Sequence, residues 1–173
     1  SVAVPSDPAA IERGAHLART RCVFCHDDDL GGKKFIDDPS FFVLNAPNLT
    51  RGAGGVGATY AEDAAWVRSI RHGVNPQGRA LVIMPAEVYY FLSDGDLGDI
   101  VAYLKSLPPV DRSWAPPQPS LLARALLGAG KIDAMVPFLS IDPRAPRPPK
   151  PEAGATVATG EYIVRTFGCR NCH

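Results

Sequence analysis

The feature that most constrains this chain is a five-residue pattern, Cys-x-x-Cys-His, that occurs twice. It reads CVFCH near the start and CRNCH at the end, and the two copies hold all four cysteines. This pattern is the attachment signature of c-type haem. The two thiols form thioether bonds with the porphyrin edge, and the adjacent histidine reaches the iron from one face. The sequence therefore predicts two covalent haems c, with Cys22, Cys25, Cys169 and Cys172 as attachment residues and His26 and His173 as iron ligands.

Zinc binding and disulfide bonds are the alternative uses of paired cysteines. Zinc ribbons separate their two pairs by roughly 15–20 residues, far fewer than lie between Cys25 and Cys169. A histidine follows the second cysteine in both copies, which neither a zinc ribbon nor a disulfide framework requires. The pattern therefore favours haem attachment over both alternatives.

Charge and hydropathy exclude some classes of binding partner and bear on the location of the chain. Lys+Arg and Asp+Glu number 18 each, so no overall field favours nucleic acid or an anionic membrane. The longest apolar run is interrupted by Pro85 and Glu87 and is shorter than the about 20 residues that cross a bilayer. The N-terminus SVAVPSDPAA lacks the features of a signal peptide. Since c-type haem is attached outside the cytoplasm, we expect an exported chain in the periplasm or on the outer face of the cytoplasmic membrane, with its export signal or anchor removed.

Three helices are expected in the first two thirds of the chain. Asp7 and Pro8 begin the first, which ends at the first haem motif. Thr59 and Glu62 form a capping-box pattern ahead of the second, AAWVRSIRHG, which Gly73 can end. Ser93 caps the third, which stops at a pair of prolines and is expected to turn Leu97, Ile100, Val101 and Leu104 inward. No segment alternates convincingly as a strand, so the sequence predicts an all-α fold.

Four segments in order, CVFCH, APNLTRG, VIMPAE and LSDGDLGDIVAYLKSL, resemble class I cytochromes c, in particular bacterial multi-haem chains built from tandem domains. The resemblance covers roughly residues 8–109 and restarts near Thr156. It implies a helical domain that binds haem c and carries single electrons.

The resemblance also implies roles for individual residues. A methionine before a proline supplies the sixth iron ligand, which corresponds to Met84 opposite His26. The Pro-Asn-Leu segment implies that the Pro47 carbonyl accepts a hydrogen bond from the other ring nitrogen of His26 and so fixes the ring. His16 and His72 stay open as alternative sixth ligands. The candidate partners of the haem propionates are Trp66, Arg71 and Arg79.

Composition divides the chain into three parts. Residues 1–112 form the first cytochrome c domain, and residues 113–155 are a proline-rich linker with room for a short helix at LLARALLGAGKI. Residues 156–173 begin a second cytochrome c domain, because TGEYIVRTFGCRNCH repeats RGAHLARTRCVFCH when Gly168 is counted as inserted. This last part is too short to bury a haem alone. We therefore expect either that the chain continues past His173 or that a neighbouring subunit covers the second haem.

Two functional classes are compatible with two haems. A haem bound by His26 and Met84 has no open site, so the chain is expected to relay electrons between redox proteins. Those partners would be a dehydrogenase, a respiratory complex or another cytochrome. The alternative is a di-haem peroxidase, which needs a vacant or displaceable iron site and nearby acid–base groups. The VIMPAE segment and the tandem repeat favour the electron carrier over an enzyme.

Overall fold

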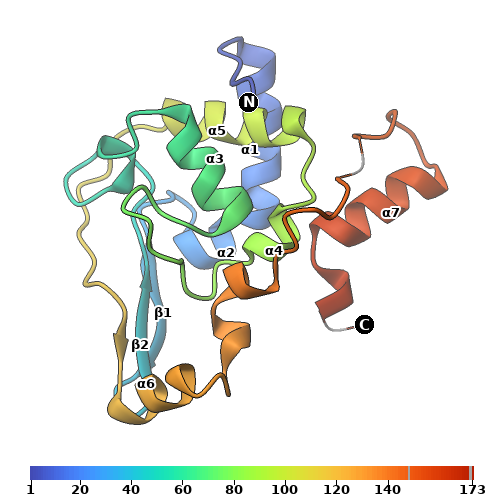
Figure 1. Cartoon of the computed structure of the whole chain (residues 1–173). Helices are drawn as coiled ribbons and strands as arrows, with labels where there is room; N and C mark the ends of the chain where they lie inside the picture. Colours follow the sequence, from blue (N-terminus) through green and yellow to red (C-terminus); the bar gives the residue numbers. More distant parts are fainter. Residues whose placement is uncertain (148, 172) are drawn as a thin grey trace.

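A helical body with a small antiparallel sheet below it makes up the protein (Figure 1). The computed structural model describes residues 1–147, 149–171 and 173, and the side chains of all of these except Arg170. Cys172, a predicted attachment residue, therefore lies outside the described residues.

Five helices form the body around the first haem motif. They are α1 (Pro8–Arg21), α2 (Val23–His26), α3 (Asp63–His72), α4 (Ala86–Tyr89) and α5 (Asp94–Ser106). Helix α1 crosses α5 at Gly14, where a Cβ atom would lie only 1.9 Å from the carbonyl oxygen of Asp99. Arg13 secures the crossing because its guanidinium donates to the Asp99 carboxylate at 2.7 and 3.0 Å. This crossing fixes the end of α1, and with it the first motif, against the core.

Most of the predicted helix ends are confirmed. The Asp7 carboxylate accepts a hydrogen bond from the Ala10 amide at the start of α1, and Ser93 caps α5 in the same way. Gly73 ends α3 in the left-handed conformation that glycine tolerates best. The predicted capping box is wrong, because α3 starts after Glu62 without a side-chain cap. Thr59 instead closes a 3-10 turn, η1 (Val56–Ala58).

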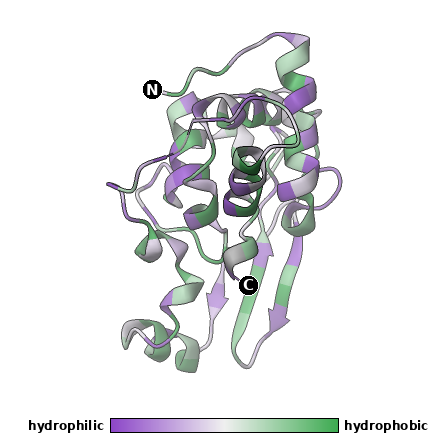
Figure 2. Ribbon diagram, turned by 90° about the vertical axis from the view of Figure 1, so that its right-hand side faces the viewer, coloured by the Kyte–Doolittle hydropathy of each residue, from purple (hydrophilic) through white to green (hydrophobic). Residues whose placement is uncertain are grey.

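A three-stranded antiparallel sheet corrects the all-α prediction. Its strands are β1 (Lys33–Asp38), β2 (Phe42–Ala46) and β3 (Gln118–Pro119), in the order β1-β2-β3. Buried and half-buried residues alternate along β2, but over only five positions. In β1 the register shifts between Lys34 and Ile36, which breaks the alternation. Figure 2 shows apolar and polar residues mixed along these ribbons, so the periodic signal is weak.

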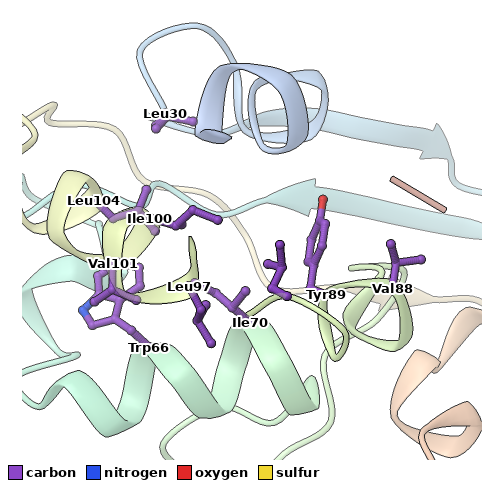
Figure 3. Close-up of a cluster of buried hydrophobic side chains, with 10 residues drawn as sticks. Leu30, Trp66, Ile70, Val88, Tyr89, Leu97, Ile100, Val101 and Leu104 are labelled. Atoms are coloured by element: carbon purple, nitrogen blue, oxygen red, sulfur yellow. The ribbon is translucent and has the colours of Figure 1, made fainter. Parts of the chain in front are cut away.

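Apolar side chains fill the space between the helices (Figure 3). Trp66 and Ile70 point inward from α3 and meet residues from α4 and α5. The inward positions predicted for α5 are confirmed as buried. The buried cluster consists of Leu30, Trp66, Ile70, Val88, Tyr89, Leu92, Leu97, Ile100, Val101 and Leu104.

The segment expected to be an extended linker packs in part against the helical body. Trp114 donates its indole N–H to the Gly31 carbonyl at 3.0 Å, and β3 pairs with the edge of β2. The short helix predicted at LLARALLGAGKI is confirmed as α6 (Leu121–Gly128). Two 3-10 turns follow, η2 (Asp133–Met135) and η3 (Pro137–Ser140). These contacts join residues far apart in the sequence, so local composition did not reveal them.

The second motif follows helix α7 (Val157–Thr166), which lies beside the body (Figure 1). Tyr162 anchors α7, because its hydroxyl donates to Asp96 at 2.6 Å and accepts from the Ser93 amide at 2.9 Å. The turn η4 (Cys169–Asn171) comes next. Among the described residues, no helix is long and apolar enough to cross a membrane.

Candidate haem site

A mostly apolar cavity of about 260 Å³ lies between the helices and the sheet. Its walls come from α2, β2, α3 and α5, from the loop at residues 81–85 and from residues 114–117. Six predicted site residues, distant in the sequence, meet in this lining: Cys22, Cys25, His26, Pro47, Trp66 and Met84.

The predicted hydrogen bond between His26 and the Pro47 carbonyl is present in the structure. The imidazole Nδ1 lies 2.8 Å from the Pro47 carbonyl oxygen, so Nδ1 carries the proton and Nε2 remains for a metal. The side chain is buried, and this burial lowers the pKa of His26, with the Pro47 bond acting in the opposite direction. A neutral imidazole in a fixed orientation is the form that ligates iron.

The two cysteines of the first motif are also kept neutral. Burial raises the pKa of Cys22 to about 12 and raises that of Cys25 as well. Uncharged thiols in an apolar wall suit thioether bonds, which carry no charge. Zinc would instead require buried thiolates.

The loop that presents Met84 is held in an unusual conformation. Ile83 has a φ of 66°, which is an outlier for a β-branched residue. Its amide donates to the Met135 carbonyl at 2.8 Å, and the Met84 carbonyl accepts from Ala86 at 2.7 Å. Strained backbone that is held on both sides is typical of functional sites. The loop thus keeps Met84 in the cavity wall.

Trp66 provides the test of whether a haem fits the cavity. Its indole nitrogen is buried and has no hydrogen-bond partner among the described residues. An unpaired buried donor costs free energy, so such groups normally have a partner. A haem propionate would supply the missing acceptor, and the apolar walls would cover the porphyrin. The residues present therefore fit a haem.

Four other candidates lie outside the cavity lining. Arg71 donates to the Leu92 carbonyl at 2.8 Å and pairs with Asp94, and its propionate role stays a prediction. Arg79 is exposed and is not part of the lining either, so the structure does not place it at the cavity. The alternative iron ligands His16 and His72 are likewise absent from the lining.

Sequence reasoning missed several residues of the lining. Tyr60, Tyr89 and Trp114 contribute aromatic walls, and Arg21 contributes a charge. The adjacency of Arg21 to the first motif was the one local signal. The aromatic residues are brought in by the fold, which no short pattern predicts.

The second motif lies elsewhere on the molecule. Cys169 and His173 are exposed and do not line the cavity. The motif contacts α4, because the Asn171 amide donates to Glu87 at 3.3 Å and Gly168 lies beside Val88.

A neutral histidine held by a backbone carbonyl, two thiols and a methionine around an apolar cavity define a class I c-type cytochrome site. The family described as Cytochrome C oxidase, cbb3-type, subunit III matches residues 9–104, and the chain belongs to this family. The matched part is therefore a c-type cytochrome domain that binds haem and carries electrons. A comparison with curated proteins found no match.

When bound, haem supplies an iron that changes oxidation state by one electron. His26 would hold the iron through Nε2, the apolar lining would cover the porphyrin, and the Trp66 N–H would be available to a propionate. Exclusion of water favours the less charged, reduced state, as does a thioether ligand.

Proposed function

We propose that this chain is an exported electron carrier with two covalent haems c that relays single electrons between redox proteins. The observation that carries the proposal is the convergence of His26 and Met84 on one cavity, each held by backbone hydrogen bonds. With both side chains as ligands, the first iron has no site for substrate. The haem attached at Cys22 and Cys25 then only gains and loses an electron.

The second haem is proposed at Cys169, Cys172 and His173. Its support is the repeated motif and the helix α7 that precedes it, as α1 precedes the first motif. Since Cys169 and His173 are exposed, protein outside the first domain would have to cover this haem. A neighbouring subunit or a further domain would do so.

The partners are proposed to be other redox proteins, namely a dehydrogenase, a respiratory complex or another cytochrome. The family description, which names a subunit of an oxidase, supports a respiratory partner. We propose the periplasm or the outer face of the cytoplasmic membrane as the location, because covalent haem attachment takes place there.

The test compares electron exchange with peroxide turnover in the full-length protein that holds both haems. We expect rapid oxidation of the reduced protein by small outer-sphere oxidants and little consumption of hydrogen peroxide. The peroxide assay should follow reductive activation and use a reduced cytochrome as electron donor. Sustained turnover at about 1–1,000 per second, the usual range of enzymes, would show a peroxidase and overturn the proposal.

A further inference from the structure

Arg21 occupies the boundary between the two haem-attachment motifs. It is the last residue of α1, directly before Cys22, and among the described residues of the lining it is the one with a charged side chain at neutral pH. Its guanidinium carbon lies 3.9 Å from the centre of the Phe167 ring, two residues before Cys169. One side chain therefore touches the wall of the first cavity and the approach to the second motif.

The geometry around Arg21 is fixed on several sides. Its carbonyl accepts from the Tyr89 hydroxyl at 2.9 Å, and its guanidinium lies 3.5 Å from the Thr166 hydroxyl. The side chain is half-buried, and its Nε has no hydrogen-bond partner among the described residues. A cation held over an aromatic face is favourable when it is partly desolvated. Arg21 is thus positioned by α4 and α7 together.

A simpler role for Arg21 is stabilisation of the α1 C-terminus, where cations are favoured. Arg19 lies in the same last turn of α1 and is exposed. A cation can therefore stabilise this helix end without contacting either motif. Burial of Arg21 beside Phe167 goes beyond what a helix end requires.

We propose that Arg21 is shared by the two haem sites and that its positive charge raises the reduction potential of both haems. The proposal rests on the proposed function, in that the second motif carries a haem. An oxidised haem has one positive charge more than a reduced one, so a nearby cation favours the reduced state. A half-buried charge is screened less than an exposed one and acts on both sites.

The experiment measures both potentials in the two-haem protein by redox titration followed by visible absorbance. The potential that disappears when Cys169 and Cys172 are both replaced by alanine belongs to the second haem. We expect Arg21→Gln to shift both potentials downward, and Arg21→Lys to retain most of both. Arg19→Gln, which removes the same charge from an exposed position, should leave both unchanged.

A downward shift of only one potential in Arg21→Gln, or equal shifts in Arg19→Gln, would overturn the shared role. An intact mass that corresponds to one haem would instead contradict the proposed function, so the two failures are distinguishable.

A second readout does not depend on the potentials. Replacement of Phe167 by leucine removes the ring beneath Arg21, so amide hydrogen exchange along α7 should become faster. Ile163→Leu, at an exposed position of the same helix, is the control and should not change the exchange. Unchanged exchange in Phe167→Leu would show that this contact does not position α7.

Discussion

Helices α1 and α7 each precede one copy of the haem-attachment motif, but the two helices bury opposite faces. Gly14 aligns with Gly160, and Thr20 aligns with Thr166. Helix α1 buries Gly14 against α5 and leaves Thr20 exposed, whereas α7 buries Thr166 and leaves Gly160 exposed. A Cβ on Gly160 would meet no atom within 4 Å. The local sequence thus sets the helix and the motif, and the neighbouring elements decide which face is covered.

The two motifs also differ in what surrounds them. Around the first, residues from most of the chain build a cavity with a fixed histidine and a methionine. Around the second, Cys169 and His173 are exposed. An attachment motif is therefore a local property, whereas an iron environment is made by contacts distant in sequence.

The same substitution at both aligned glycines tests most strongly whether the two helices bury opposite faces. In Gly14→Ala the new methyl group would meet the backbone of Asp99, which cannot move aside, so we expect a loss of about 3 kcal/mol in the free energy of unfolding. In Gly160→Ala the methyl group enters open space within a helix, and a gain of about 0.5–1 kcal/mol is expected.

Chemical denaturation of the haem-loaded chain of residues 1–173 measures both values. Changes of the same sign at the two positions would contradict the assignment of opposite faces.

Trp66→Phe tests the difference between the first haem site and the proposed second one. It removes the buried N–H that we assign to a propionate, and a hydrogen bond to a charged group is worth about 1.5 kcal/mol at the low end of its range. The propionate charge would be less compensated, so the potential of the first haem should fall while that of the second stays constant. Redox titration measures this.

Trp114→Phe is the matched control, because Trp114 also lines the cavity but donates to the Gly31 carbonyl. An equal shift of the potential in both variants would remove the special role of Trp66.

The smallest expected effect concerns the docking of α7 at high pH. Burial, followed by the hydrogen bond to Asp96, raises the pKa of Tyr162 to about 12 from an ordinary value of 10. The folded protein keeps this proton at a pH where the unfolded chain loses it, so the contribution of Tyr162 to stability is complete below pH 10 and is lost between pH 10 and about 12.

Denaturation at a series of pH values should therefore show a steeper decline above pH 10 in the natural protein than in Tyr162→Phe. The hydroxyl bonds are worth about 1 kcal/mol near neutrality. Parallel curves for the two proteins would show that the ionisation of Tyr162 is not coupled to the docking of α7.

Sequence patterns predicted the parts of the fold that depend on neighbouring residues. The cap at Asp7 and the helix end at Gly73 were of this kind. The sheet was missed because β2 alternates over only five positions and β1 is irregular. The capping box was predicted wrongly because the residue types of the motif are present, but α3 starts after Glu62 without a side-chain cap.

The candidate site was predicted in its motif residues and missed in its walls. His26 and Pro47 form the pair that the resemblance implied, but Arg21 and Trp114 enter the lining through tertiary contacts. The ion pair between the buried Arg71 and the exposed Asp94 cannot be recognised from adjacent letters either. Distances across the fold, which the sequence does not state, decided each of these cases.

We propose that Met84 closes the first iron to outside ligands, and carbon monoxide binding to the reduced protein is the direct test. We expect no carbon monoxide binding at the first haem of the natural protein, and both binding and a lower potential in Met84→Ala. Met135→Leu, a change at the other methionine, should behave as the natural protein does. An unchanged visible spectrum and potential in Met84→Ala would contradict the account and return His16 and His72 to consideration.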